Sequence, residues 1–317
     1  MRAHGLSGPS GLRFVDLPDP PAPAGPPRVR LAVHAAGVGF VDTLLTRGLY
    51  QRTPTLPFIP GLEVCGEVLE APGGCGYAVG DRVAGHVMTG GFADTAWVLP
   101  ELLAPLPGEL SPVQGAAMVV NHHTALVALA DRALLRPGES VLVHGAGGGL
   151  GGATVQLAAA LGASVVAVAG TPERRELAAR AGAGTVCGPD EWFDAVRDAG
   201  GVDVIVDPVG GEVFERSVRC LASGGRLVSV GFASGLIATA KANRLLLRSA
   251  SVLGISWAEM LDRDATLFAR TAKHLADLVH AGLRPLVTGT YDLADGASAL
   301  HAIEERTSTG KLVLTTR

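Results

Sequence analysis

Hydrophobic and polar residues alternate in two different ways along the chain. From residue 141 onward, short uncharged runs rich in Val, Ile and Leu are separated by longer segments that mix Ala, Leu and charged residues. Over residues 1–119, short apolar runs alternate instead with turns rich in Pro and Gly. The later pattern is typical of buried parallel strands separated by helices, and the earlier one of a compact, mostly β domain.

The stretch 141–170 contains no Asp, Glu, Lys or Arg, and its length is sufficient to cross a bilayer. It also contains eight glycines, six of them between Gly145 and Gly152. Each interior glycine costs a helix about 1 kcal/mol relative to Ala, so we expect no spanning helix. VLVHG predicts a buried strand, GATVQLAAALGA a helix and SVVAVAG a second strand, which together form a βαβ unit.

Four further apolar runs extend this pattern: TVCG near residue 185, VDVIVD from Val202, RLVSVG from Arg226 and SVLGIS from Ser251. Helical segments lie between most of them, with PERRELAARAG before the first and EVFERSVRCLA between the second and the third. Six strands with intervening helices predict a doubly wound sheet, which binds a dinucleotide beyond the carboxyl ends of its strands.

The glycine loop of the βαβ unit precedes a helix N-terminus, where backbone N–H groups are unpaired and the helix dipole favours negative charge. Gly147, Gly149 and Gly152 match the pattern G-x-G-x-x-G, as do other registers of the same loop. The alternative is a tight turn that only lets the helix pack on the strand. Because a strand precedes the loop and a helix follows it, we expect the loop to bind a pyrophosphate.

The end of the second strand indicates which dinucleotide is bound. NAD sites usually place Asp or Glu there, on the ribose 2′-hydroxyl. Here the tip is Gly170 and Thr171, and the next helix begins PERRE, with Arg174 as its first arginine. A small tip with a hydroxyl and a nearby arginine suits a 2′-phosphate and therefore NADPH. The alternative is a solvated helix face on which Glu173 and Glu176 pair with the arginines.

The composition narrows the class of protein. The chain has 317 residues, of which 48% are hydrophobic and 18% charged, and this length corresponds to about two domains. The net charge is −4, and the sequence contains no block of Lys or Arg. We therefore expect no nucleic-acid or membrane partner. No apolar secretory segment is visible, and we expect a cytoplasmic protein.

The cysteines lack metal or disulfide spacing and are expected to be reduced: Cys65, Cys75, Cys187 and Cys220.

Several motifs occur in the order and spacing of a known family. They are GVGFVD, LPFIPGLEVCGEV, GYAVGDRVAG, VLVHGAGGGLGGATVQLAAALGA, DPVGG, GGRLVSVGFASG and TGKLVL. The chain resembles, nearly end to end, the zinc-free NADPH:quinone oxidoreductase group of the medium-chain dehydrogenase/reductase superfamily. The resemblance implies an α/β fold with a GroES-like, mostly β catalytic domain at 1–119 and 257–317. It further implies a Rossmann NADPH-binding domain at 120–256 and a homodimer.

The resemblance also defines where zinc would bind. Zinc-dependent relatives carry Cys in G-x-C-x-x-D and His in G-H-E, and the corresponding residues here are Gly39 and Leu62. Neither side chain can ligate a metal, and the four-cysteine lobe of those relatives is missing. The adjacent residues His122 and His123 are expected in the cleft or in packing. We therefore expect no metal.

The resemblance implies specific site residues. Tyr50 matches a tyrosine that lines the active-site cleft, where its hydroxyl would stabilise charge on the substrate oxygen, and the alternative is a cleft-wall aromatic. Asp42 matches an aspartate that the family retains. It is a candidate catalytic residue, and the alternative is a structural hydrogen-bonding role. Asn121 and Thr124 are expected to contact the nicotinamide. The other implied cofactor contacts are Ala146, Gly147, Gly148, Gly149, Leu150, Gly170, Thr171, Arg174, Val209, Gly231, Phe232 and Ser234.

Two departures from the family bear on the substrate. Gly39 stands where the group has Asn, and Leu44 stands where some quinone reductases have a second tyrosine, so we expect a more apolar and roomier pocket. The implied function is NADPH-dependent, zinc-independent hydride transfer to quinones or activated α,β-unsaturated carbonyls, both small molecules. One alternative is an enoyl-thioester reductase acting on CoA or carrier-bound substrates. Another is a non-catalytic NADPH-binding sensor or structural protein.

Overall fold

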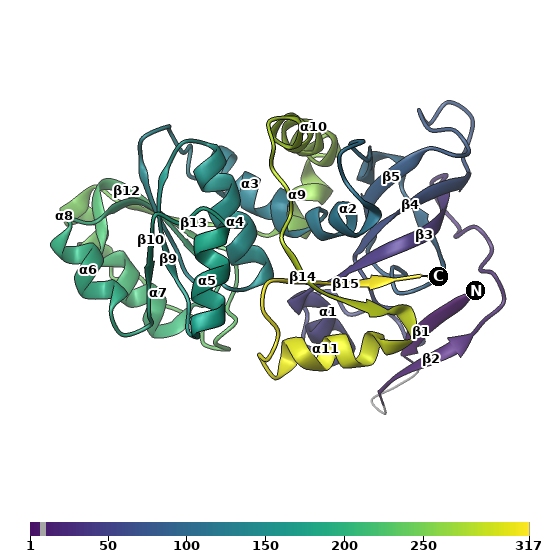
Figure 1. Ribbon diagram of the computed structural model, residues 1–317, viewed down its shortest axis with the longest axis horizontal. Helices are drawn as coiled ribbons and strands as arrows, with labels where there is room; N and C mark the ends of the chain where they lie inside the picture. The colour runs from purple at the N-terminus through teal and green to yellow at the C-terminus, as the bar shows by residue number, and fades with distance from the viewer. Residues whose placement is uncertain (7–10, 317) are drawn as a thin grey trace. The chain divides into compact units, whose positions relative to one another are not determined.

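The computed structural model describes residues 1–6 and 11–316 (Figure 1). The chain divides into two compact units, of which unit 1 comprises Met1–Val120 with Ala265–Arg317 and unit 2 comprises Asn121–Asp264. The segment 257–264, expected from the sequence in the first domain, falls in unit 2. There the Trp257 ring packs against the His123 ring with 5.5 Å between centroids.

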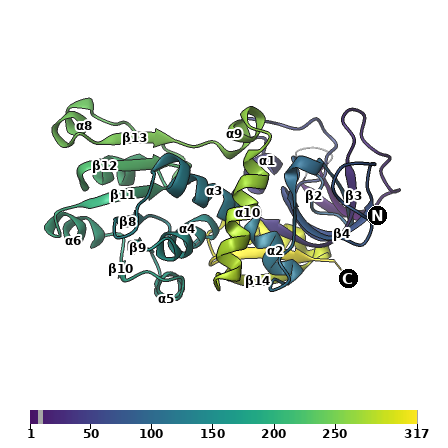
Figure 2. The same cartoon turned by 90° about the horizontal axis from the view of Figure 1, so that it is seen from above.

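Unit 2, all of whose residues are described, contains one parallel sheet with the strand order β10-β9-β8-β11-β12-β13. Its strands are β8 (Ser140–Val143), β9 (Ser164–Val168), β10 (Thr185–Cys187), β11 (Val202–Asp207), β12 (Leu221–Ser229) and β13 (Ser251–Gly254). In chain order this is 3-2-1-4-5-6, the order of a doubly wound dinucleotide-binding sheet. The predicted six-stranded α/β sheet is confirmed, and β13 lies at its edge beside β12 (Figure 2).

Helices cover both faces of this sheet. The helices of unit 2 are α3 (Asn121–Leu126), the π-helix η2 (Val127–Arg132), α4 (Gly149–Ala160), α5 (Pro172–Arg180), α6 (Trp192–Asp198), α7 (Gly211–Val218), α8 (Ala242–Arg248) and α9 (Trp257–Arg263). Helices α4 and α5 lie on one side of the central strands, and α6 and α7 on the other (Figure 1). On the α6–α7 side, Trp192 and Phe214 share one core with Leu142 and Ile205 of the strands.

The uncharged stretch 141–170 folds as β8, the glycine loop, α4 and β9, as its sequence pattern predicts. Among residues 1–6 and 11–316, no helix combines the length and the apolar character that crossing a membrane requires.

Unit 1 is built mostly from strands, as its sequence predicts. They are β1 (Arg2–Leu6), β2 (Leu12–Asp16), β3 (Val29–Val38), β4 (Glu63–Glu70), β5 (Arg82–His86), β6 (Thr95–Val98), β7 (Leu103–Pro105), β14 (Val287–Asp292) and β15 (Lys311–Thr315). One sheet has the order β14-β15-β3-β4-β5-β7, with β6 also paired to β3, and β1 pairs with β2. The helices are α1 (Phe40–Thr46), η1 (Pro100–Leu102), α2 (Pro112–Met118), α10 (Leu267–His280), η3 (Leu293–Asp295) and α11 (Gly296–Glu304).

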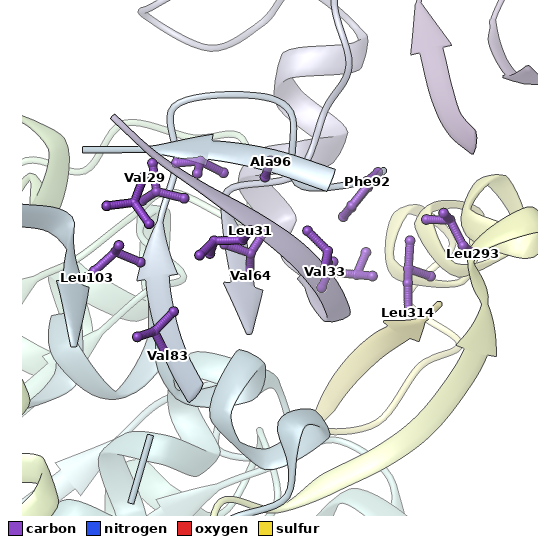
Figure 3. Packing of buried hydrophobic residues seen from close by; sticks show 14 of the residues in the cluster. Val29, Leu31, Val33, Val64, Val83, Phe92, Ala96, Leu103, Leu293 and Leu314 are labelled. Atoms are coloured by element: carbon purple, nitrogen blue, oxygen red, sulfur yellow. The ribbon is translucent and has the colours of Figure 1, made fainter. Parts of the chain in front are cut away.

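The core of unit 1 joins the two ends of the chain. Leu31 and Val33 of β3 are fully or nearly fully buried in one cluster with Val64 of β4 and Leu314 of β15 (Figure 3). Strand β15 pairs antiparallel with β3 in the register Leu314↔Ala36. The C-terminal segment therefore completes the sheet that begins near the N-terminus, as the resemblance implies.

Candidate functional site

One edge of the unit 2 sheet collects the loops that the sequence associates with a dinucleotide. The strands are parallel, so the loops after β8, β9, β11 and β12 leave at the same edge, and β8 lies between β9 and β11. The chain order reverses at β8, which is where a doubly wound sheet binds its ligand. The loops after β8 and β11 touch there, since a Cβ at Gly145 would lie 3.5 Å from Cγ of Pro208.

The loop after β8 presents unpaired backbone amides. Helix α4 begins at Gly149 after the N-cap residue Gly148, and no side chain caps it. The amides of Gly149, Leu150 and Gly151 in its first turn have no acceptor within the helix. A helix N-terminus of this kind, with no competing cap, favours an anion such as a pyrophosphate.

The glycine that the loop needs most is Gly151. A Cβ at this position would lie 2.2 Å from the carbonyl oxygen of Gly145, whose own φ is +60°, so a side chain at Gly151 would separate α4 from the loop. A Cβ at Gly152 would meet nothing closer than the carbonyl oxygen of Ala146 at 3.6 Å. The G-x-G-x-x-G register that ends at Gly152 therefore locates the loop but misses its closest contact.

The tip of β9 carries the residues expected to select the cofactor. Thr171 caps α5, and its Oγ1 accepts a hydrogen bond from the Arg174 amide at 3.3 Å. The Arg174 stem lies on the glycine loop, because a Cβ at Gly147 would fall 2.4 Å from Cβ of Arg174. Arg175 turns back to the strand, where its Nη1 donates to the carbonyl oxygen of Gly170 at 3.2 Å. The structure thus brings the expected residues of the loop and the tip together.

The loops after β11 and β12 form the third part of the edge. Asp207 is fully buried, and its Oδ1 accepts the Val209 amide at 2.7 Å, while burial raises the pKa of its carboxyl group. The segment 231–234 lies against this loop, since the Ser234 amide donates to the carbonyl oxygen of Val209 at 2.9 Å. Phe232 is 44% exposed there and available to a ligand. Asp207 is part of the DPVGG motif but is not among the site residues predicted from the sequence.

Helix α3 carries Asn121 and Thr124 at the start of unit 2. Thr124 is buried, and its Oγ1 has no hydrogen-bond partner in the described part of the chain. An orphaned hydroxyl is suited to a ligand amide or carbonyl. His122 and His123, expected in the cleft or in packing, are both buried. Nε2 of His122 lies 3.3 Å from Oε1 of Gln156, and the His123 ring packs against the Trp257 indole.

In unit 1, Asp42 occupies the first turn of α1 with no exposed surface. Its Oδ2 accepts the Gly39 amide at 2.8 Å and its Oδ1 accepts the Gly61 amide at 3.1 Å. Burial raises the pKa of Asp42 to about 7 against these hydrogen bonds, and the nearby Glu63 carboxylate adds to the rise. With both oxygens engaged, Asp42 holds two backbone segments in place.

A buried ion pair that the sequence analysis missed lies beside Asp42. Glu63 and Lys311 are the first residues of β4 and β15, and the Lys311 ammonium contacts Oε1 of Glu63. Oε2 of Glu63 accepts the Val120 amide at 3.0 Å. Because Val120 is the last residue of unit 1 before α3, this carboxylate fixes the peptide at which the chain passes to unit 2.

The two positions that correspond to zinc ligands in the zinc-dependent relatives have no side-chain atom that can bind a metal. Gly39 has an extended backbone with φ −127°, and Leu62 is 8% exposed. His86 is buried beside them, hydrogen-bonds to the Leu62 carbonyl group, and has a pKa lowered to about 4 by burial. Within residues 1–6 and 11–316, no group of three or more His, Cys, Asp and Glu side chains is arranged to hold a metal ion.

Tyr50 is half-buried in the segment after α1. Burial raises the pKa of its phenol despite the opposing charge of Arg52. The group is therefore a protonated donor at neutral pH, available to an acceptor oxygen.

Comparisons with known proteins cover nearly the whole chain. A model of the alcohol dehydrogenase GroES-like domain matches residues 25–108, and one of the zinc-binding dehydrogenase family matches residues 149–273. Quinone oxidoreductase-like protein 2 of Bos taurus is 36% identical over 93% of this chain and 86% of its own length. Quinone oxidoreductase of Mus musculus is 32% identical over 99% of this chain and 96% of its own. A solved structure of quinone oxidoreductase from Thermus thermophilus, also described in complex with NADPH, has a TM-score of 0.88 and 38% identity, covering 99% of this chain and 100% of that one.

A GroES-like unit joined to a doubly wound dinucleotide-binding sheet defines a medium-chain dehydrogenase/reductase. Within that class, the chain belongs to the quinone oxidoreductase group, and it is an oxidoreductase of that type. The resemblance to the quinone oxidoreductase group of the medium-chain dehydrogenase/reductase superfamily is thereby confirmed.

Proposed function

We propose that this oxidoreductase uses NADPH to reduce quinones or activated α,β-unsaturated carbonyl compounds and that it does so without zinc. The observation that carries the proposal is the edge of the unit 2 sheet, where Arg174 lies on the glycine loop before α4. The Thermus thermophilus relative described in complex with NADPH supports the same cofactor.

The residues present fit this cofactor. The free amides of Gly149 to Gly151 suit the pyrophosphate, and the tip at Thr171 with Arg174 suits the 2′-phosphate. The orphaned Oγ1 of Thr124 suits the carboxamide of the nicotinamide. When bound, the nicotinamide supplies the hydride, and these residues bind and orient it.

The acceptor is assigned to unit 1. Gly39 and Leu62 offer no ligand for a Lewis acid, so the acceptor has to be electron-poor already, as quinones and enones are. The Tyr50 hydroxyl donates to the acceptor oxygen as negative charge develops there. Asp42 acts indirectly, because its two oxygens hold the Gly39 and Gly61 amides.

A turnover assay tests the proposal. Purified protein is mixed with NADPH and a panel of quinones, enones and enoyl thioesters, with and without a chelator, and its zinc content is measured by elemental analysis. The proposal expects turnover of quinones or enones that the chelator does not reduce. Stoichiometric zinc that the activity requires would contradict the metal-free reaction. A clear preference for enoyl thioesters would identify a thioester reductase, and NADPH binding without any turnover would identify a non-catalytic binding protein.

A further inference from the structure

The first turn of α5, which follows the tip of β9, carries an acid beside its arginines. Glu173 lies in the first turn of α5, two residues after the capping residue Thr171, and its side chain is exposed. Hydrogen bonds from its own backbone amide and from the Thr171 hydroxyl hold the pKa of Glu173 below its usual value, with help from the Arg175 charge. The carboxylate is therefore ionised and bound at the hydroxyl expected to receive a 2′-phosphate.

The charged groups near the ribose 2′ position decide between the two nicotinamide cofactors. In doubly wound sheets, the group at the end of the second strand meets the ribose 2′ position, where an acid suits the hydroxyl of NADH and an arginine suits the phosphate of NADPH. Here both kinds of group lie in the first turn of α5, directly after the tip. The Glu173 carboxylate accepts a hydrogen bond from the Thr171 hydroxyl, and the stem of Arg174, on the same helix, lies on the glycine loop.

We infer that Glu173 is a specificity-determining residue that lowers the affinity for NADPH and lets the enzyme accept NADH as well. Its carboxylate repels the 2′-phosphate and withholds the Thr171 hydroxyl from it, whereas the 2′-hydroxyl of NADH can donate to the same carboxylate. The inference rests on the proposed cofactor site, and it extends that site to a second cofactor.

The size of the effect follows from two opposing contacts. An arginine hydrogen-bonded to a phosphate favours NADPH by about 10- to 150-fold. A carboxylate facing a doubly charged phosphate at a solvated surface opposes this by about 3- to 10-fold at low salt. The wild-type preference for NADPH over NADH is therefore expected at about tenfold, a ratio that leaves NADH usable.

The test compares Glu173→Gln and Glu173→Ala with the wild type by titrating each protein with NADPH and with NADH and following nicotinamide fluorescence. Glu173→Gln removes the charge and keeps an acceptor for Thr171, whereas Glu173→Ala also frees the hydroxyl. We expect both variants to bind NADPH about 3- to 10-fold more tightly at low salt, with a smaller gain at high salt. The Kd for NADH should stay equal or rise.

Glu176→Gln is the matched control, because Glu176 lies on the same helix, is also exposed, and changes the net charge equally. It should leave both Kd values unchanged. An unchanged Kd for NADPH in both Glu173 variants, or an equal gain for both cofactors, would overturn the inference. Turnover is not part of this readout, so a protein that binds NADPH as expected but reduces no acceptor would remove the proposed reaction and leave this inference standing.

Discussion

Arg174 and Gly147 are in direct contact, with the arginine stem lying where a side chain at Gly147 would be. A Cβ at Gly147 would fall 2.4 Å from Cβ and 2.7 Å from Cγ of Arg174. The glycine loop and the first turn of α5 meet at this contact. The loop therefore fixes the base of the side chain that is expected to reach the 2′-phosphate, which reduces the entropy that the arginine loses on binding.

The Arg174→Ala variant should lose affinity for NADPH specifically. A hydrogen bond to a charged group contributes about 1.5–3 kcal/mol, so the Kd for NADPH should rise roughly 10- to 150-fold. NADH lacks the phosphate, and its Kd should change little. Fluorescence titration with both cofactors measures the difference, and equal losses for the two would show that Arg174 is only a helix-surface residue.

Two neighbouring glycines should respond to alanine in opposite directions. In Gly151→Ala the new Cβ would press on the Gly145 carbonyl oxygen from 2.2 Å, a backbone contact that yields little. Overpacking of this kind costs about 1–3 kcal/mol, or several degrees in Tm. Gly152→Ala meets nothing closer than 3.6 Å and replaces a glycine inside α4, which should stabilise the helix by up to about 1 kcal/mol. Thermal melts of both variants without cofactor measure the two changes in Tm. If both variants gain or both lose stability, Gly151 is not the glycine at which α4 contacts the loop.

For the glycine loop, the sequence predicts the flanking elements but not which glycine makes the close contact. The change of hydrophobic period around residue 145 predicts β8, α4 and β9, because strand and helix periods are local properties. The glycine that touches the loop depends on how α4 docks, and that is set by tertiary packing. In a run that contains Gly147, Gly148, Gly149, Gly151 and Gly152, the pattern fits several registers, and only the close approach at Gly151 separates them.

Less of the candidate site in unit 1 could be predicted from the sequence. Glu63 and Lys311 are 248 positions apart and meet only because β15 pairs with β3 beside β4. No local pattern encodes such a contact. Asp42 was identified through the family resemblance, but its role follows from its burial and its two amide partners, which the sequence does not contain.

Acid should destabilise unit 2 through His144. This residue is 1% exposed, its Nε2 lies 2.7 Å from Oγ of Ser217, and burial lowers its pKa to about 3. The folded pKa lies below the unfolded value of about 6.5, so the unfolded state binds the extra proton. Its contribution to stability is complete above pH 6.5 and is lost as the pH falls from there towards 3, at about 1.4 kcal/mol per pH unit.

The His144→Phe variant tests this contribution. The ring can keep its edge contact with Trp192, and the Ser217 hydroxyl still donates to the Val213 carbonyl oxygen at 2.7 Å. We expect the loss of Tm between pH 7 and pH 5 to be smaller in the variant than in the wild type. Asp42, with its raised pKa, contributes the opposite slope in unit 1 but is common to both proteins, so the difference isolates His144. An identical loss in both would contradict the assignment.

We propose a homodimer formed through the β13 edge. Strand β13 is the last strand of the sheet, and an uncovered edge of this kind is an aggregation hazard. Four large apolar side chains on the segment before it are 63–78% exposed: Leu236, Ile237, Leu246 and Leu247. A two-fold axis would pair both edges and cover both sets of side chains.

Light scattering at micromolar concentration should give the mass of a dimer. The double variant Leu246→Lys/Leu247→Lys should shift it to a monomer, because charges would be buried at the interface. Val79→Lys is the matched control, since Val79 is 71% exposed on unit 1. A wild-type monomer, or a dimer that survives both lysines, would count against this edge.

The Tyr50→Phe variant tests whether the Tyr50 hydroxyl takes part in the reaction or whether the side chain only packs. If its hydroxyl meets the substrate oxygen as charge develops, the bond is stronger in the transition state than in the ground state, and its loss lowers kcat. Tyr50→Phe removes the hydroxyl and keeps the ring. A charge-stabilising donor is worth roughly 10²–10³ in kcat in a water-excluded site. The phenol is only half-buried, so we expect a loss of about 10- to 100-fold for enones. Quinones, whose charge is more delocalised, should lose less.

Tyr77→Phe is the control for a hydroxyl that only supports the fold. The Tyr77 hydroxyl donates to the Leu103 carbonyl oxygen at 2.7 Å inside unit 1, so its removal should lower Tm and leave kcat unchanged. Tyr50→Phe should do the reverse, with a lower kcat and an unchanged Tm. Steady-state rates with one quinone and one enone, measured beside thermal melts of both variants, give the comparison. If kcat with both acceptors survives in Tyr50→Phe while the fold is intact, Tyr50 is a wall of the acceptor site and the enzyme works by positioning alone.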